Sequence, residues 1–211
     1  MIPELTNLWL FLGAVLILNV TPGPDMMYCA ANGLSHGARA GFTSAVGVGF
    51  GAVFHSTLAA VGITAVIAAS DMAFDVIRIL GALYLLWMGY KQLRAPAQAA
   101  TTTAMLPQRS QKAIFTRGLI TNMLNPKVAL FFIAFLPQFI SVELGNLALQ
   151  IMFLGALVGI SGTLINGMVG AFAGRASNYM SAKYNIGGWI SKISGGVMIL
   201  LGIRLFFLEK S

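Results

Sequence analysis

The sequence predicts an all-α membrane protein with six transmembrane helices, arranged as two inverted three-helix repeats. The 211-residue chain is 57% hydrophobic and only 9% charged, whereas soluble domains are about 45–50% apolar and about 25% charged. Its apolar runs are long enough for helices that cross a bilayer, which takes about 20 residues. They do not alternate every second residue, as the strands of a membrane β-barrel would.

Six apolar segments follow one another along the chain. They are residues 5–33, 41–69, 73–91, 115–139, 146–173 and 187–208. The first segment has no basic stretch and no small-residue cleavage site at its start, so we expect no removable signal peptide. Residues 95–113 are rich in Ala, Thr, Gln and Pro and are expected to form a linker. The predicted domains are therefore a first three-helix repeat at 1–94 and a second at 114–211.

Basic residues gather in alternate loops between these segments. By the positive-inside rule the loops that carry them are cytoplasmic, which makes 95–113 a cytoplasmic linker and puts both termini on the opposite side. The residues are Arg39, Lys91, Arg94, Arg109, Lys112, Arg117, Arg175 and Lys183. This distribution explains the net charge of +7 by membrane topology, so we expect no nucleic-acid partner.

The two halves share short motifs. Thr21-Pro22 in the first segment corresponds to Asn125-Pro126 in the fourth, and residues 89–91 correspond to 202–204. Because three crossings bring the second half into the bilayer in the opposite sense, a repeat here is an inverted one. Gly and Pro coincidences are also common in membrane helices, so two unrelated halves are the alternative.

Prolines interrupt two segments near their middle, in ILNVTPGPDMM (17–27) and NMLNPKVALFF (122–132). Proline removes a backbone donor, and irregular backbone at membrane depth is tolerated only where it is buried in protein or lines a polar cavity. One such break in each half is typical of a transporter's central site. The alternative is a pair of simple kinks repaired by neighbouring helices.

The chemistry expected at these breaks suits an amino acid. Broken helices leave N–H groups that bind a carboxylate and carbonyls that bind an ammonium. Asp25 follows the first break, where it can cap the helix, accept the substrate ammonium or carry a coupling proton. Lys127 follows the second. Because a charge at a helix centre costs about 2.5–3.5 kcal/mol, we expect Asp25 and Lys127 to approach each other or to share a polar cavity.

Glycines recur at four-residue spacing, as in Gly47 and Gly51 or Gly155 and Gly159. This spacing lets helix backbones approach closely, so it predicts packing faces, and the abundance of such faces suggests a homodimer. His55, one turn beyond Gly51, and Asn166 are candidates for gating or proton relay. The alternative is that each is simply hydrogen-bonded within the bundle.

Several classes of protein are excluded by what the sequence lacks. It has no GxxxxGK[ST] loop for an ATP-driven pump, no HExxH, paired-Cys or clustered-His pattern for a metal, and no nucleophile with a base in a recognisable arrangement. We therefore expect no enzyme activity and no cofactor. Cys29, the single cysteine, is expected to be a packing residue.

The motifs together resemble the LysE/RhtB family of bacterial amino-acid exporters. The resemblance rests on NVTPGPDMM, GVGFG, LGALYLLWMGYKQLR and TNMLNPKVALFFIAFLPQF, and it extends over essentially the whole chain. It implies a six-helix protein of the bacterial inner membrane that expels amino acids or related metabolites with the electrochemical gradient. The family's signature falls on Pro22, Gly23, Pro24, Asn125, Pro126 and Lys127, with Asp25 where the family usually has a polar residue.

The sequence thus predicts a proton-coupled secondary exporter of neutral or hydroxylated amino acids. The expected polar contacts to the substrate are Thr21, Asp25, Asn122, Asn125 and Lys127. Two alternatives remain open. One is a transporter of the same architecture for a metal cation or another metabolite, although Asp25 is the only carboxylate at the breaks. The other is a membrane scaffold that transports nothing.

Overall fold

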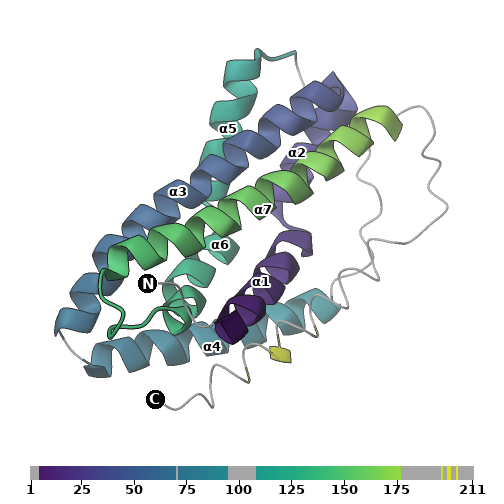
Figure 1. Ribbon diagram of the computed structural model, residues 1–211. Helices are drawn as coiled ribbons and strands as arrows, with labels where there is room; N and C mark the ends of the chain where they lie inside the picture. Colours follow the sequence, from purple (N-terminus) through teal and green to yellow (C-terminus); the bar gives the residue numbers. More distant parts are fainter. Residues whose placement is uncertain are drawn as a thin grey trace.

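The computed structural model describes residues 5–69, 71–94 and 108–176, together with the isolated residues 196, 199, 200 and 203. All regular structure in this part of the chain is helical (Figure 1), in agreement with the predicted class. Most of the predicted linker, at 95–107, and nearly all of the sixth predicted segment, 187–208, lie outside the described residues. The helices observed elsewhere follow the other five predicted segments.

The first predicted segment is two helices, α1 (Leu5–Val20) and α2 (Pro24–His36), and their axes are bent by 52° at the break. Pro24 occupies the first turn of α2, where a missing N–H costs nothing. The helix ends at Gly37, whose φ of 85° lies in the left-handed region, and the Gly37 N–H donates to Gly33 O at 2.8 Å. The predicted interruption of this segment is therefore confirmed.

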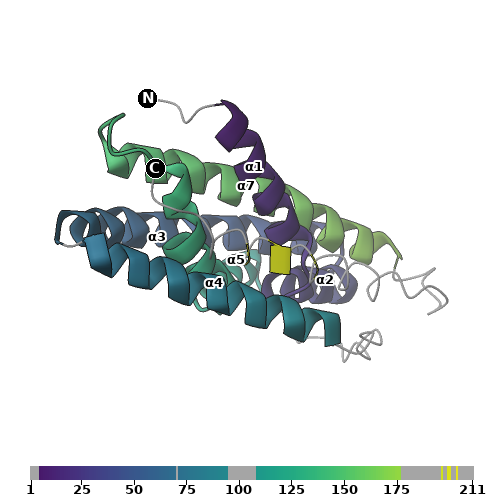
Figure 2. The ribbon, with the colours of Figure 1, turned by 90° about the horizontal axis from the view of Figure 1, so that it is seen from below.

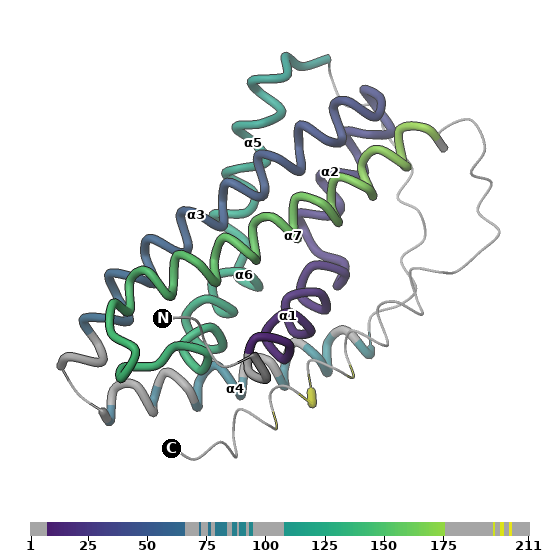
Figure 3. Tube along the Cα trace, in the orientation of Figure 1, coloured from purple at the N-terminus to yellow at the C-terminus, as the bar shows by residue number. Residues whose placement is uncertain are grey.

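The fourth predicted segment is also broken, into α5 (Gln111–Met123) and α6 (Pro126–Leu130), and this pair is bent by 48°. Ser110 caps α5 by accepting from Ala113 N, so the helix begins at Gln111, ahead of the predicted 115. Beyond α6 the chain widens into one π-helical turn, η1 (Phe131–Phe135), and tightens into a 3₁₀ turn, η2 (Leu136–Phe139). Pro137, in the first turn of η2, has no N–H for a regular α-helical bond, so the α-helix does not continue there. Figure 3 shows the bend between α1 and α2 and the bend between α5 and α6 in the Cα trace.

Three longer helices complete the described part: α3 (Ala38–Ala69), α4 (Asp71–Arg94) and α7 (Leu147–Ala176). Among the described residues, α3 and α7 are each long and apolar enough to cross a membrane, and each bent pair qualifies as one further span. This gives two to four candidate spans. Crossing of the bilayer by α4 and by 187–208, and the inverted repeat, stay predictions.

Close backbone contacts hold α3 against α7, which lie side by side in Figures 1 and 2. A Cβ added to Gly41 would lie 2.5 Å from the carbonyl carbon of Gly170, and one added to Gly159 would lie 3.0 Å from Gly49 O. These contacts confirm the prediction that the spaced glycines are packing faces, because a side chain at either position would press against the facing backbone.

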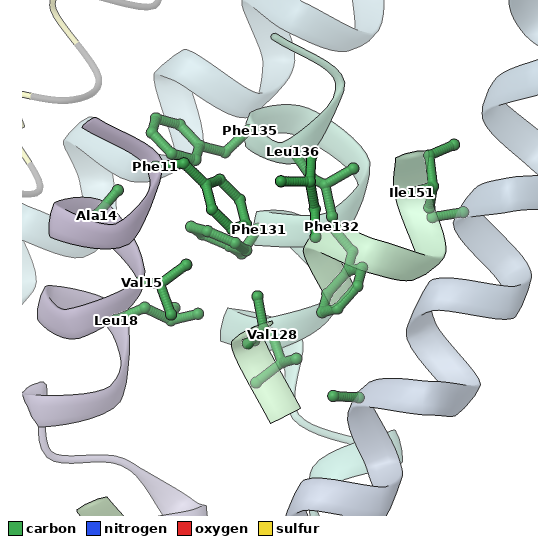
Figure 4. Close-up of a cluster of buried hydrophobic side chains, with 14 of the residues drawn as sticks. Phe11, Ala14, Val15, Leu18, Val128, Phe131, Phe132, Phe135, Leu136 and Ile151 are labelled. Atoms are coloured by element: carbon green, nitrogen blue, oxygen red, sulfur yellow. The ribbon is translucent and has the colours of Figure 1, made fainter. Parts of the chain in front are cut away.

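An apolar cluster joins the two broken segments beside their breaks. Figure 4 shows Phe11, Val15 and Leu18 of α1 facing residues of the second pair. The partners are Val128, Phe131, Phe132, Phe135 and Leu136. Ring centroids of Phe11 and Phe131 lie 6.1 Å apart, within the range for favourable aromatic pairs. This packing holds α1 against α6 and the π-helical turn η1.

Candidate functional site

The polar residues predicted at the two breaks are buried together. Thr21, Asp25, Asn122 and Asn125 are each less than one-tenth exposed. Polar groups in such surroundings need hydrogen-bond partners. The partners come in large part from the other break, so the two breaks form one site.

The first break receives its missing donor from the second. Lys127 Nζ donates to Leu18 O and to Thr21 O, both at 2.9 Å. Leu18 O is the carbonyl that an N–H at position 22 would have bonded in a continuous helix, and Pro22 has none. The ammonium therefore caps the last turn of α1, where the helix dipole also favours a cation. A Cβ on Gly23 would lie 3.3 Å from Lys127 Nζ, so glycine leaves room for this approach.

The second break is stabilised mainly by its own residues. The Asn125 side chain caps α6 by accepting from Lys127 N at 3.0 Å, and Pro126 follows in the first turn. His55 Nε2 lies 3.0 Å from Asn122 O. A carbonyl only accepts, so this nitrogen carries a proton and donates. The His55 ring also stacks on Phe132, with centroids 5.6 Å apart.

A second contact crosses between the breaks: Asn122 Nδ2 donates to Asp25 Oδ2 at 2.8 Å. Gly51 of α3 makes room for it, because a Cβ there would lie 2.5 Å from Asn122 Cβ. Asp25 and Lys127 form no direct ion pair, since the carboxylate accepts from Asn122 and the ammonium donates to carbonyls. The two charges instead share one site.

A narrow cavity of about 20 Å³ lies between the breaks. Asp25 and Lys127 both line it, so the prediction that they share a polar cavity is confirmed. Other polar side chains in its wall are Asn19, Thr21, Asn122 and Asn166. This volume holds about one water molecule, so an amino acid fits only after the lining helices separate.

The structure divides the predicted site residues into two groups. Those that line the cavity are Thr21, Asp25, Asn122, Lys127 and Asn166; those that shape the breaks or support them without lining it are Pro22, Gly23, Pro24, Asn125, Pro126 and His55. Sequence reasoning missed Asn19, which donates to Ser161 Oγ at 2.9 Å and lines the cavity. Its position in the last turn before the break is the signal that could have found it.

A buried polar cavity between interrupted apolar helices is characteristic of a multi-pass membrane transporter. The comparison of sequences agrees. Residues 16–208 match the LysE type translocator family, and the chain belongs to this family. It is accordingly a membrane transporter and not an enzyme.

Leucine efflux proteins are among the relatives of this chain. The chain is 28% identical over 198 residues to a leucine efflux protein of Enterobacter sp. (strain 638), covering 92% of this chain and 90% of the relative. It is 36% identical over 139 residues to a leucine efflux protein of Klebsiella pneumoniae, covering 66% and 65%. It is also 36% identical over 137 residues to an uncharacterized membrane protein of Vibrio cholerae, covering 64% and 65%. No solved structure matches the chain significantly.

Proposed function

We propose that this protein exports neutral amino acids across the bacterial inner membrane by secondary active transport, and that the zwitterion binds in the cavity between the two breaks. Membership of the LysE type translocator family and similarity to leucine efflux proteins support amino-acid efflux in general. The choice of a neutral substrate rests on the charges of the site.

The observation that carries this proposal is the pair of opposite charges, Asp25 and Lys127, in one buried cavity. Their sum is zero, as is the net charge of a zwitterion, whereas a cationic amino acid would bring an uncompensated charge into a low-dielectric site. Each charge also has unused capacity. Asp25 Oδ1 has no hydrogen-bond partner, and Lys127 has three ammonium hydrogens, two of which go to Leu18 O and Thr21 O.

Binding would weaken the contacts that cross between the breaks. A substrate carboxylate competes for Lys127 and for the start of α2, which has no side-chain cap, while an ammonium competes for Asp25. The closed cavity must widen to admit an amino acid, so we expect binding to accompany a separation of the broken segments. Movement of one three-helix unit against the other would then expose the site alternately to each side.

The architecture behind this movement is part of the proposal: six crossings, as repeats at 1–94 and 114–211 joined by a cytoplasmic linker at 95–113. The paired breaks support it, although residues 111–113 belong to α5. The homodimer is a separate prediction. The glycine faces that suggested it contact other parts of the same chain, as Gly41 does with Gly170 and Gly47 with Phe115, so they no longer argue for a dimer.

Export is coupled to the proton gradient in this proposal, and Asp25 carries the proton. A buried carboxylate in contact with the substrate site suits this role. Dissipating the proton gradient with a protonophore should then stop efflux against a concentration gradient. Efflux that continues unchanged would assign the coupling to another ion.

The test of the function is efflux from cells loaded with a panel of amino acids. Cells that express the wild type should lose neutral amino acids faster than empty cells, and Asp25→Asn and Lys127→Ala should remove that difference at equal expression. A rate identical in expressing and empty cells for every amino acid would contradict the proposal. The described residues contain no group of three or more His, Cys, Asp or Glu side chains close enough to hold a metal ion. A transporter of a metal cation would show no difference between expressing and empty cells for any amino acid.

A further inference from the structure

We propose that the cavity recognises its substrate by the amino group, through three oxygens supplied by three helices: Asp25 Oδ1 of α2, Asn122 Oδ1 of α5 and Asn166 Oδ1 of α7. The inference rests on the proposed function and assigns the orientation of the bound amino acid. The ammonium enters the oxygen-lined part of the cavity, and Asn166 is a binding residue instead of a gate or relay.

All three oxygens are buried hydrogen-bond acceptors that receive no hydrogen bond. Asp25, Asn122 and Asn166 are 6%, 4% and 4% exposed, and none of these oxygens has a hydrogen-bond partner. All three residues line the same cavity. Asn122 Oδ1 lies against Gly51 of α3. A buried acceptor without a donor is costly, so three such acceptors on residues that line one cavity point to a ligand that donates hydrogen bonds.

The remaining polar atoms of these side chains are already engaged, which leaves the oxygens available. Asn122 Nδ2 donates to Asp25 Oδ2 at 2.8 Å, and Asn166 Nδ2 donates to Gly162 O at 3.0 Å. Lys127, the cation of the site, donates to two carbonyls of α1. Asn125 Nδ2 is also buried without a hydrogen-bond partner, but it is a donor, and Asn125 does not line the cavity.

An ammonium group fits this set of acceptors in number and charge. It has three N–H donors and no acceptor, and one of the three oxygens belongs to a carboxylate. Asn166 cannot relay a proton by titration, because its amide has no ionisable proton in the physiological range. Its position on α7, outside both breaks, adds a third helix to the contacts that hold the amino group.

Three ligands test this orientation: leucine, leucinamide and N-acetyl-leucine. For each, the thermal shift of the purified full-length protein is measured in detergent. Leucinamide keeps the amino group and blocks the carboxylate; N-acetyl-leucine does the reverse. We expect leucine to raise Tm most, leucinamide less and N-acetyl-leucine not at all, because only a ligand that binds the folded state stabilises it. A larger shift with N-acetyl-leucine than with leucinamide would overturn the assignment.

Asn166→Leu tests the third oxygen against a matched control, Asn32→Leu. Asn32 is also fully buried, donates to the carbonyl four residues earlier (Tyr28 O, 2.9 Å) and has an oxygen without a hydrogen-bond partner, but it lies away from the cavity. We expect Asn166→Leu to weaken leucinamide binding about tenfold, the order of one hydrogen bond to a charged group. Asn32→Leu should leave it within about twofold, and Asn166→Asp, which keeps an oxygen, should retain binding. If Asn166→Leu and Asn32→Leu weaken leucinamide binding equally, the inference is contradicted.

An inorganic cation could use the same oxygens, so the measurements are repeated with choline in place of sodium. If leucinamide binds equally well in choline and in sodium, the ammonium is the group that the oxygens bind. If sodium alone shifts Tm and leucine binds only in its presence, the oxygens bind the metal ion.

Transport in proteoliposomes distinguishes the proposed function from the ammonium site. Binding of leucinamide without leucine efflux would contradict the proposed function only, and efflux of N-acetyl-leucine as fast as leucine would contradict the ammonium site only.

Discussion

The two breaks solve the same local problem in different ways. The first, at Thr21–Gly23, has no cap of its own and takes its donor from Lys127, more than a hundred residues away in the sequence. The second, around Asn125, is capped by its own side chain and is supported by His55. Proline alone therefore does not decide how a broken membrane helix is stabilised; the residues around it do.

The direction of the crossing contacts sharpens this difference. Asn122 and Lys127 both belong to the second break, and both donate to the first, to Asp25 and to the α1 carbonyls. The second break is thus the donor and the first the acceptor. We expect the first break to be the part that rearranges when substrate competes for these donors, and changes at the second break to damage both.

The largest effect is expected for Lys127→Met, which keeps most of the side-chain volume and removes the ammonium. Leu18 O and Thr21 O then lose their donor, and the Asp25 carboxylate loses its compensating charge. Each lost hydrogen bond to the charged group is worth about 1.5–3 kcal/mol, so efflux should fall to background and Tm should drop. Lys91→Met is the control, because Lys91 is exposed and lies over the Trp87 ring at 4.9 Å. If Lys127→Met retains efflux, the first break does not depend on a donor from the second.

The next effect distinguishes the prolines. Pro22→Ala restores an N–H that can bond Leu18 O in competition with Lys127, and it removes a helix penalty of about 3 kcal/mol, so α1 and α2 should straighten and efflux should fall at unchanged or increased stability. Pro126→Ala lies in the first turn of α6, where proline replaces no bond, and should retain efflux. Paired efflux and thermal-unfolding measurements check both, and similar loss in the two variants would mean that the breaks are equivalent.

A smaller effect is expected at Gly51, which makes room for Asn122. Gly51→Ala places a methyl group against the Asn122 side chain, and overpacking of this kind costs about 1–3 kcal/mol. Efflux should fall with it, because Asn122 holds Asp25. Gly62→Ala on the same helix is the matched control, since nothing lies within 4 Å of its added Cβ. If both variants behave alike in efflux and in Tm, the close approach at Gly51 does not matter.

The smallest effect is expected at the cap of the second break. Asn125→Ala removes the acceptor of Lys127 N, at a cost of about 1 kcal/mol, while Asn125→Ser retains a capping oxygen. Because α6 positions Lys127, Asn125→Ala should also reduce efflux. Ser110→Ala removes the cap of α5 away from the cavity and should lower Tm without affecting efflux. Efflux unaffected by Asn125→Ala would show that this cap is not needed to position the ammonium.

Features of the chain that depend on neighbouring residues could be predicted from the sequence. The first break follows from Pro22, which has no N–H for Leu18 O. Pro24 and Pro126 mark the first turns of the helices that follow the two breaks. The helices at 38–69 and 147–176 lie close to the predicted 41–69 and 146–173, since long apolar runs predict them directly. The π turn at 131–135 was not predicted, because its wider register leaves no simple signal in one sequence.

Only the tertiary structure decided which atoms meet. The sequence alone indicated that Asp25 and Lys127 needed compensation, because an isolated charge in a membrane helix is costly. It could not show that Lys127 donates to Leu18 O and Thr21 O, that Asn122 holds Asp25, or that Asn166 from α7 completes the cavity. A missing donor is a local property of proline, whereas its replacement depends on how closely glycine contacts allow the helices to approach.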